Sequence, residues 1–482
     1  MFSVKSGGIS SGANKDNYFS LTPFKFPSPR SLTISSILIL SMVSAVYFLI
    51  LGSYGGMEVY ASMIYQPNDC RSDLGWTPLI GVHCFGDYPS PLLPAMQSDP
   101  WSGTAPTNYP ATGLSIIWLF GHIGLWLGSR VGLLAYLFVL TAAVLTPAVW
   151  AARGSRGHEK VVVFLVCSAA AIPAWMAIDR GNTIGLEVPI MLAYLIALRR
   201  EKWIYVALMV VLATFIKPQF AVLGLVLLAY RKWQISILTG MGIAITGILS
   251  YLLWPAQFPG TIIRSVRIML SYASSADGSL GGASPLARYN VSFVKGLFLL
   301  PDALAANSKG GVLPADYLHE ARVCVGLGIL FLVAISTLIL GRRIPPVMIG
   351  IVLLATSSLF VNLTHNYYLV FAVPIAALII RDPQGPAGTG LLDTTTRCHR
   401  IAAFLISFAT AASIAQIPLP LPVAVKAYTV GQATYAIDGA GPLYVETTAV
   451  LTPLLWLAAC VATLVSYSLT HKGDLKALQP ER

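Results

Sequence analysis

The stretch that decides the fold runs from residue 179 to residue 233 and reads DRGNTIGLEVPIMLAYLIALRREKWIYVALMVVLATFIKPQFAVLGLVLLAYRKW. Two apolar runs, 183–198 and 203–229, are bounded by charged clusters, and the second run is interrupted at Lys217-Pro218. A helix needs about 20 apolar residues to span a bilayer, and the interruption leaves roughly 13 residues on each leg of the second run. We therefore predict that residues 203–229 form a hairpin of short helices inside a membrane.

The composition of the whole chain agrees with this interpretation. Of its 482 residues, 56% are apolar and 11% are charged, whereas an ordinary soluble domain carries about 25% charged residues. A soluble fold of this size could not bury so much apolar surface. The composition excludes a disordered chain, a fibrous protein, a coiled coil and an ordinary cytosolic enzyme. We predict an all-α polytopic membrane protein with about 10 to 13 transmembrane helices.

Further apolar runs support that count. They cover residues 31–52, 111–127, 131–152, 161–178, 235–254, 322–341, 346–362, 367–381, 401–417 and 447–468. In the region 111–152, topology requires an odd number of crossings, so one of its two runs can instead lie in the membrane interface. Prolines at or within several runs favour a bundle that encloses a cavity.

The basic residues predict the orientation of the chain. The net charge is +11, from 31 Lys and Arg against 20 Asp and Glu, and the basic residues form short clusters between the apolar runs. Such clusters mark cytoplasmic segments, so nucleic acid is not expected as a partner. The clusters lie at 15–30, 153–160, 199–202, 231–232, 342–343, 397–400 and 472–476.

This orientation divides the chain into three parts. We expect a cytoplasmic tail at 1–30, a transmembrane domain at 31–469 that begins with a retained signal anchor, and a cytoplasmic tail at 470–482. The outer segments are then 53–110, 179–182, 255–320, 363–366 and 418–446, of which 53–110 is a long first outer loop. Cys70 and Cys84 share that loop and can form a disulfide if it faces an oxidising compartment.

Charged groups at membrane depth are costly and indicate functional sites. The candidate residues that converge on the outer side are Glu58, Asp179, Arg180, Asn182, Lys217 and His365. Plainer interpretations exist: Glu58 can be a solvated carboxylate, Asp179 and Arg180 can close a turn, Lys217 can extend to the interface, and His365 can be an interfacial residue. Glu187 is expected to partner a nearby base. Four aspartates of the long loop are expected to be solvated: Asp69, Asp73, Asp87 and Asp99.

These residue types suit the displacement of a phosphate leaving group. Arg and Lys hold a phosphate through charge-assisted hydrogen bonds, and a carboxylate can take the proton of an attacking hydroxyl. The sequence contains none of the motifs for nucleotide hydrolysis, nicotinamide binding or zinc proteolysis. We expect no cofactor and no metal.

The stretch 179–233 resembles bacterial polyprenyl-phosphate-dependent glycosyltransferases of the GT-C fold. It is similar to the family of actinobacterial α-1,2-mannosyltransferases and α-arabinofuranosyltransferases, which show an Asp-x-Gly-Gln/Asn turn, a basic break, and a helix ending in Lys near a Pro. Further similarities are Asn108-Tyr109-Pro110, Asn290-Val291-Ser292 and Thr364-His365-Asn366-Tyr367-Tyr368. The resemblance implies a GT-C type bundle.

The resemblance also implies an activity and residue roles. Glu58 stands where the family has its acidic base, usually Asp, and Tyr60 lies two residues further on; Asp69 and Asp73 are alternatives for the base. Arg180 and Lys217 are expected to bind the donor phosphate, and the other expected site residues are Asp179, Asn182, Asn290 and His365. The implied reaction is an inverting displacement on a polyprenyl-phosphate sugar, with mannose or arabinofuranose expected.

The implied acceptor is a glycan or glycolipid at the outer, periplasmic face of a bacterial cytoplasmic membrane, whose lipids surround the protein. A transporter or flippase of a lipid-linked glycan is the main alternative, although the two halves show no internal repeat of the kind common in transporters. A scaffold subunit of an envelope-synthesis complex is a third interpretation, but it leaves the convergence of polar residues unexplained.

Overall fold

The computed structural model describes residues 27–55, 85–103, 106–274, 290–308, 317–393, 399–421, 428–430, 433–435 and 444–469. The candidate residues Glu58, Tyr60, Cys70 and Cys84 lie outside the described residues, as do Asp69 and Asp73. The predicted base and the predicted disulfide therefore remain predictions.

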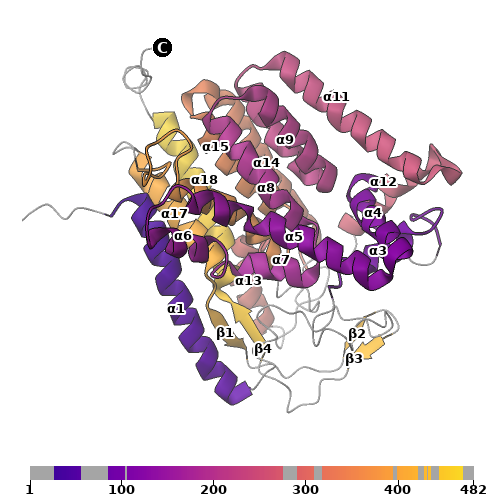
Figure 1. The fold of residues 1–482 in the computed structure, drawn as a ribbon, viewed down its shortest axis with the longest axis horizontal. Helices are drawn as coiled ribbons and strands as arrows, with labels where there is room; N and C mark the ends of the chain where they lie inside the picture. The colour runs from indigo at the N-terminus through magenta and orange to yellow at the C-terminus, as the bar shows by residue number, and fades with distance from the viewer. Residues whose placement is uncertain are drawn as a thin grey trace, which may run out of the picture.

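Every predicted apolar run forms a helix or a pair of helices (Figure 1). These are α1 (Pro29–Gly55), α4 (Ala111–Leu127), α5 (Ser129–Ala152), α6 (Glu159–Cys167) with α7 (Ile172–Arg180), α8 (Ile184–Arg199), α9 (Trp203–Ile216), α11 (Trp233–Ser250), α14 (His319–Leu340), α15 (Pro346–Leu359), α16 (Ala372–Ile380), α17 (Arg400–Ile414) and α18 (Thr452–Leu469).

The lengths of these helices identify a membrane-embedded protein. Among the described residues, five helical segments are long and apolar enough to cross a membrane: Pro29–Leu51, Ser129–Ala152, Trp233–Leu253, His319–Arg343 and Thr448–Leu469. The helices α6 and α7 meet at a bend of 49° and together pass the same test. Six further apolar helical segments are only 10–17 residues long. The predicted total of 10 to 13 spans stays a prediction.

The outward-facing side chains of the long helices are apolar. Met42 on α1, Phe138 on α5, Leu238 on α11 and Phe331 on α14 each expose more than half of their surface. Lipid chains can cover such side chains without the cost that water would impose. By contrast, α15 is buried along its whole length and lies in the centre of the bundle with α8 and α16.

The predicted hairpin at 203–229 is confirmed. The helix α9 ends at Ile216, Lys217 is extended, and the chain continues as the 3-10 helix η4 (Pro218–Gly224) and α10 (Leu225–Ala229). The start of α9 and the residue that follows α10 lie side by side, because the ring centroids of Trp203 and Tyr230 are 4.9 Å apart. Proline causes the break at Lys217 because it disfavours a helical residue before it.

Two features of the fold were not predicted from the sequence. The bundle is helical, as predicted, but among the described residues two short strand pairs accompany it: β1 (Pro418–Leu421) pairs antiparallel with β4 (Tyr444–Thr447), and β2 (Tyr428–Val430) pairs with β3 (Ala433–Tyr435). These strands have three or four residues, which is too short to produce a recognisable alternation.

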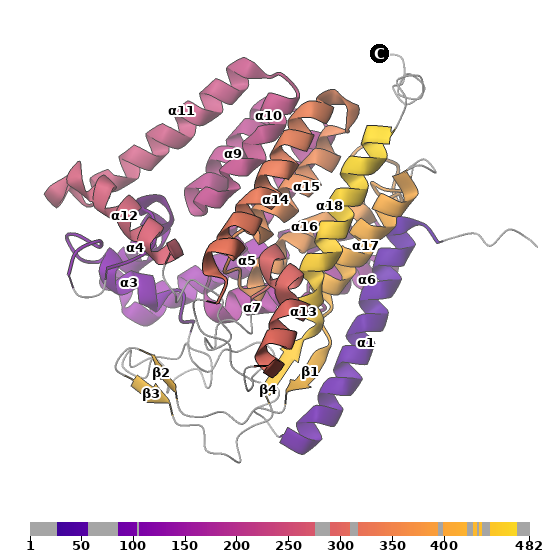
Figure 2. The same cartoon turned by 180° about the vertical axis from the view of Figure 1, so that it is seen from behind.

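The predicted outer loops also contain helices. The described part of 53–110 includes α3 (Pro89–Ala95), and the described parts of 255–320 include α12 (Gly260–Ser274) and α13 (Phe293–Ser308). Short 3-10 helices occur in five further places: Tyr251–Leu253, Pro255–Gln257, Gly341–Arg343, Asn366–Phe371 and Thr448–Leu451. Figures 1 and 2 show α11 and α12 extending to one side of the bundle and α1 lining the other.

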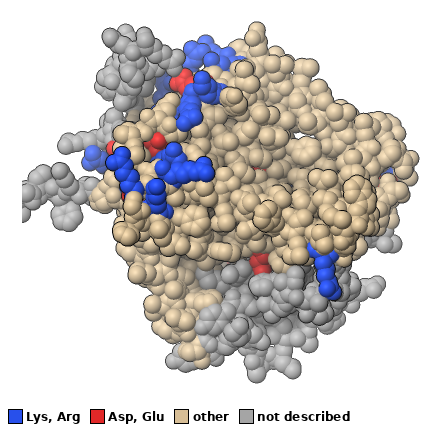
Figure 3. Space-filling view, in the orientation of Figure 1, with Lys and Arg blue, Asp and Glu red and all other residues tan. Residues whose placement is uncertain are grey.

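The basic clusters gather at one end of the bundle, as the orientation argument predicted. Arg30 pairs with Glu159, Arg199 pairs with Asp382, and Arg342 donates to the carbonyl of Tyr230. The first contact joins the start of α1 to the start of α6, the second joins the end of α8 to the segment after α16, and the third joins the segments after α10 and α14. We call this the basic end. In Figure 3 most of the visible Lys and Arg lie toward the side where α1 begins.

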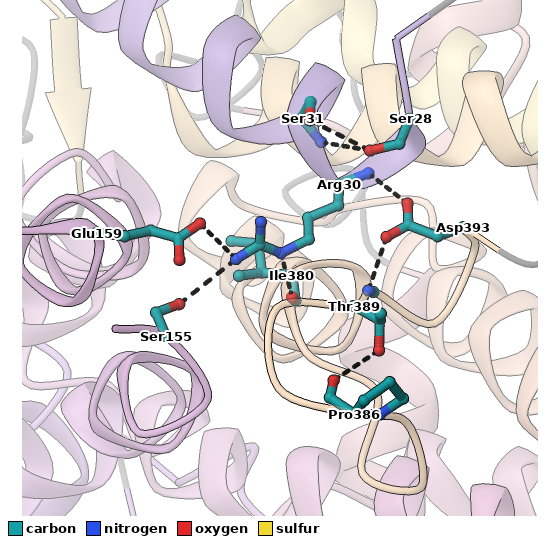
Figure 4. A network of polar contacts seen from close by, with 10 residues as sticks. Ser28, Arg30, Ser31, Ser155, Glu159, Ile380, Pro386, Thr389 and Asp393 are labelled. Atoms are coloured by element: carbon teal, nitrogen blue, oxygen red, sulfur yellow. Dashed lines mark hydrogen bonds and ion pairs between the residues drawn. The ribbon is translucent and has the colours of Figure 1, made fainter. Parts of the chain in front are cut away.

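The start of α1 is fixed at the basic end by one arginine. Arg30 pairs with Glu159 at 2.6 Å, and its Nε donates to the carbonyl of Ile380 at 2.8 Å (Figure 4). Its backbone amide donates to Asp393, which also accepts from the amide of Gly390. Arg30 is mostly buried, whereas the side chain of Glu159 is 39% exposed. The guanidinium of Arg30 donates both to Glu159 and to the carbonyl of Ile380, so Arg30 is the centre of this group of contacts.

We predict that Arg30→Met lowers the free energy of unfolding by about 1–3 kcal/mol, because it leaves the carbonyl of Ile380 and the carboxylate of Glu159 without their donor. Glu159→Gln should cost less, since the amide keeps a hydrogen-bond acceptor and the carboxylate is partly exposed. Thermal unfolding of the purified protein in detergent measures both. Equal losses in the two variants would contradict a clamp centred on Arg30.

Candidate functional site

The end of the bundle opposite the basic end carries an ion pair between Asp87 and Arg180. Arg180 Nη2 donates to Asp87 Oδ1 at 2.6 Å and Nε donates to Oδ2 at 3.2 Å. Asn182 Nδ2 donates to the same Oδ2 at 2.6 Å. Asp87 comes from the turn before α3, Arg180 is the last residue of α7, and Asn182 lies between α7 and α8. The contact therefore joins two segments that lie 93 residues apart in sequence.

The turn at 179–182 is shaped to receive residues 85–88. Gly181 ends α7 in the left-handed conformation with φ +63°, which glycine adopts without the cost that a Cβ imposes. A Cβ there would lie 3.2 Å from the carbonyl oxygen of Phe85 and from the Cβ of Tyr88. The amide of Asp87 donates to the carbonyl of Arg180, and the hydroxyl of Tyr136 donates to that of Gly181. The two segments are thus in direct backbone contact.

Lys217 lies at the break of the hairpin, between two aromatic rings. Its Nζ is 4.9 Å from the ring centroid of Tyr109 and 5.9 Å from that of Tyr368. Among the described residues, the ammonium has no ion pair and no hydrogen-bond acceptor. Cation–π contacts stabilise a lysine by about 0.5–2 kcal/mol, but they leave its three donors available for an anion.

The aromatic segment 365–368 lies next to both Arg180 and Lys217. The rings of His365, Tyr367 and Tyr368 form a stack with centroid separations of 5.2 and 5.3 Å. The guanidinium of Arg180 lies 5.8 Å from the ring centroid of Tyr367, while Lys217 lies near Tyr368. Arg180 and Lys217 therefore belong to one site with a shared aromatic wall.

Asn290 holds this wall in place. Its Oδ1 accepts from the amides of Ser292 and Thr364, and its Nδ2 donates to the carbonyl of Asn362. Asn290 also forms a β-bridge with His365 and is fully buried. The structure thus gives Asn290, predicted as a site residue, a positioning role.

Burial changes the protonation of two groups at the site. Burial raises the pKa of Asp87 to about 6, even though Asn182, Lys217 and Tyr367 all act to lower it. Burial together with the charges of Arg180 and Lys217 lowers the pKa of His365 to about 3. At neutral pH the carboxylate of Asp87 is therefore charged and the imidazole of His365 is neutral. Its buried Nδ1 has no hydrogen-bond partner in the described part of the chain.

The structure brings together most of the predicted site residues that it describes. Arg180, Asn182, Lys217 and His365 meet as predicted, and Asp179 is buried beside them at the end of α7. This convergence could be predicted because each residue lies at the end of an apolar run, and topology assigned all these ends to one side.

Sequence analysis missed Asp87, and the prediction that it is solvated is wrong. Asp99, predicted to be solvated as well, is 6% exposed and pairs with Arg264 of α12. Both aspartates occur in a polar loop, where most carboxylates are hydrated, and nothing local to them signals a distant arginine. The excess of Lys and Arg over Asp and Glu did not indicate that these aspartates are paired, because most of the basic residues lie at the basic end.

The site has the groups of an anion-binding site. It combines a lysine with available donors, an arginine held by a carboxylate, and polar aromatic side chains. Among the described residues, no three or more His, Cys, Asp and Glu side chains lie together as a metal site would require. No protein family, no curated protein sequence and no solved structure matches this chain.

We predict that Gly181→Ala destabilises the protein by roughly 2–4 kcal/mol, because it combines a left-handed alanine with crowding against Phe85 and Tyr88. Gly157→Ala is the matched control. Gly157 also has a positive φ, of +54°, but no atom lies within 4 Å of an added Cβ, so we expect a loss of only about 1–2 kcal/mol.

Thermal unfolding in detergent compares the two glycine variants. A larger loss for Gly181→Ala isolates the packing of residues 85–88 on the turn. Equal losses would show that this packing contributes no stability.

Proposed function

We propose that this protein is a membrane glycosyltransferase that moves a sugar from a polyprenyl-phosphate donor to a glycan or glycolipid acceptor. The observation that carries the proposal is the placement of Lys217 and Arg180 in one site, beside Asp87 and the stack of His365 and the tyrosines. A phosphate attached to a lipid can reach such a site while its polyprenyl chain stays in the hydrocarbon.

In this proposal Lys217 is the principal ligand of the donor phosphate. Its ammonium is held between tyrosine rings, and phosphate is an anion that such a point charge binds well. Arg180 uses two of its nitrogens on Asp87. The main role of Arg180 is therefore to hold that carboxylate and the 179–182 turn in position. Its positive charge also contributes to the electrostatic attraction of the phosphate.

The reaction needs a base and a leaving group. A hydroxyl of the acceptor attacks the anomeric carbon of the sugar, and its proton passes to a carboxylate. The bond between the anomeric carbon and the phosphate oxygen breaks, and the polyprenyl phosphate leaves as a monoester. Lys217 stabilises the negative charge that develops on that phosphate. We assign the base to Glu58, on the resemblance of its position to that of the family base, and the support of the site to Asp87.

We further propose that the site faces the periplasmic side of a bacterial cytoplasmic membrane. The gathering of the basic clusters at the opposite end of the bundle supports this orientation, because such clusters stay in the cytoplasm.

The base is tested with two variants assayed on a panel of polyprenyl-phosphate sugars. We predict that Glu58→Gln abolishes transfer and leaves donor binding intact. Asp87→Asn should instead raise the KM for the donor roughly tenfold, because Arg180 loses a charged partner, and should reduce kcat less. Glu159→Gln, at the basic end, is the control.

Full activity of Glu58→Gln would reject Glu58 as the base. Loss of kcat without a change of KM in Asp87→Asn would transfer that role to Asp87. Donor sugars that bind and are never consumed would instead favour a transporter or flippase.

The orientation is tested with single cysteines in a background where the six native cysteines are replaced. Ser90 and Glu201 are both exposed and lie toward opposite ends of the bundle. We predict that a membrane-impermeant maleimide labels Ser90→Cys in spheroplasts and labels Glu201→Cys only after lysis. The reverse pattern would place the site in the cytoplasm.

A further inference from the structure

Asp99, which lies between α3 and α4, is a buried carboxylate that joins two distant parts of the chain. Its side chain is 6% exposed. Oδ2 accepts a hydrogen bond from the guanidinium of Arg264 on α12, and Oδ1 accepts one from the backbone amide of Trp101 at 3.1 Å. Arg264 lies 165 residues away in sequence and also donates to the side-chain oxygen of Gln257. Asp99 therefore fixes the chain at Trp101 relative to α12.

Trp101 extends this connection to Tyr109. Its indole Nε1 donates to the carbonyl of Tyr109 at 3.0 Å, and the residue is 1% exposed. Its ring packs against Tyr251 and edge-on against Trp254, at centroid separations of 5.2 and 5.4 Å. A buried indole that is packed between rings and hydrogen-bonded at its N–H is held in one orientation. The carbonyl of Tyr109 is therefore held from the side of α12, while its amide donates to the hydroxyl of Thr107.

The start of α4 packs directly on the backbone beside Lys217. In the first turn of this helix, a Cβ added to Gly113 would lie 2.9 Å from the carbonyl oxygen of Ile216, the residue before Lys217. Glycine permits this close approach because it has no Cβ. Tyr109 lies two residues before α4, so the segment that Trp101 fixes leads directly to the break of the hairpin.

The ring of Tyr109 contacts the charged group of Lys217. The Nζ of Lys217 lies 4.9 Å from the centroid of that ring, and an aromatic face attracts a cation, so the position of the ring affects where the ammonium rests. Fixing a lysine side chain costs conformational entropy. An anion that finds the ammonium already in place does not bear that cost. The placement of Tyr109 therefore bears on the affinity of Lys217 for an anion.

We propose that Asp99 is a positioning residue for Lys217. Together with Arg264, it fixes Trp101 and, through the indole, the backbone of Tyr109. The ring of Tyr109 then holds the Lys217 ammonium where the donor phosphate binds. The proposal rests on the proposed function, in which Lys217 is the principal ligand of that phosphate. The effect of Asp99 on the affinity for the donor passes through Tyr109, so it disappears when that ring is removed.

The test measures the affinity of the full-length protein in nanodiscs for a radiolabelled polyprenyl phosphate. Asp99→Ala removes both acceptor oxygens, whereas Asp99→Asn keeps one for the amide of Trp101. Trp101→Phe removes the indole N–H, keeps an aromatic ring and leaves every charge in place. Asp99→Ala and Trp101→Phe are also made in a Tyr109→Leu background. Lys217→Gln shows whether the lipid binds at this site.

Asp302→Ala is the matched control for the loss of a buried carboxylate. Asp302 on α13 is buried and pairs with Arg322 of α14. The guanidinium of Arg322 also donates to the carbonyl of Tyr317 and lies over the ring of Phe298. Thermal unfolding of every variant checks that it is folded before its affinity is compared.

Asp99→Ala and Trp101→Phe should each weaken binding of the lipid roughly threefold to tenfold, the factor expected for the loss of one cation–π contact. Asp99→Asn should weaken it by less than about twofold, because an acceptor for the amide remains. Tyr109→Leu alone should cost roughly threefold to tenfold, and in that background neither substitution should add a further loss, since coupled residues are not additive. Asp302→Ala should leave the affinity unchanged.

The positioning role would be overturned by unchanged affinity in Asp99→Ala and Trp101→Phe, or by losses that add to that of Tyr109→Leu. An equal loss in Asp302→Ala would overturn it as well, because the effect would then be one of general stability. A loss in Asp99→Asn as large as that in Asp99→Ala would assign the effect to charge and also reject the role. If binding still depends on Lys217 in these cases, the phosphate site of the proposed function stands. Binding that is unaffected by Lys217→Gln would overturn both proposals.

Discussion

The ion pair between Asp87 and Arg180 is the contact on which the rest of the site depends. It ties the segment before α3 to the turn between α7 and α8, and it is reinforced by Asn182 and by the backbone hydrogen bond from Asp87 to the carbonyl of Arg180. The pair is mostly buried, with side-chain exposures of 8% for Arg180 and 16% for Asp87. Removing one partner of such a pair leaves an uncompensated charge, which is far more costly than the pair is stabilising. The turn, the loop and the guanidinium that lies beside Tyr367 are therefore fixed together.

Lys217 differs from Arg180 because aromatic rings, and not a carboxylate, surround its charged group. A proline breaks the 203–229 hairpin beside it, and the tyrosines at 109 and 368 contact its ammonium. Arg180 is committed to a protein carboxylate, whereas Lys217 keeps its donors for a ligand. The site thus combines one cation that builds the structure with one that can bind an anion. The neutral imidazole of His365 adds a polar group without adding charge.

The sequence predicted the helical framework well because apolar run length and basic clusters are local signals. The break at Lys217, the return of the hairpin and the meeting of Arg180, Asn182 and His365 follow from such signals combined with topology. Asp87 could not be predicted, because its importance comes from a partner 93 residues away and its own neighbourhood is an ordinary polar loop. The strands near 418–447 were missed for a related reason: they are shorter than the window in which alternation is visible. The role of Glu58 remains a prediction from resemblance.

The central claim is that Lys217 binds a lipid-linked phosphate beside the Asp87–Arg180 pair. An electron cryo-microscopy structure of the full-length protein in nanodiscs with a polyprenyl phosphate tests it most directly. The account predicts density for the phosphate within hydrogen-bond distance of the Lys217 ammonium, with the Asp87–Arg180 pair intact. A phosphate bound elsewhere, or a Lys217 that stays between the two tyrosine rings with no phosphate near it at saturating lipid, would contradict the account.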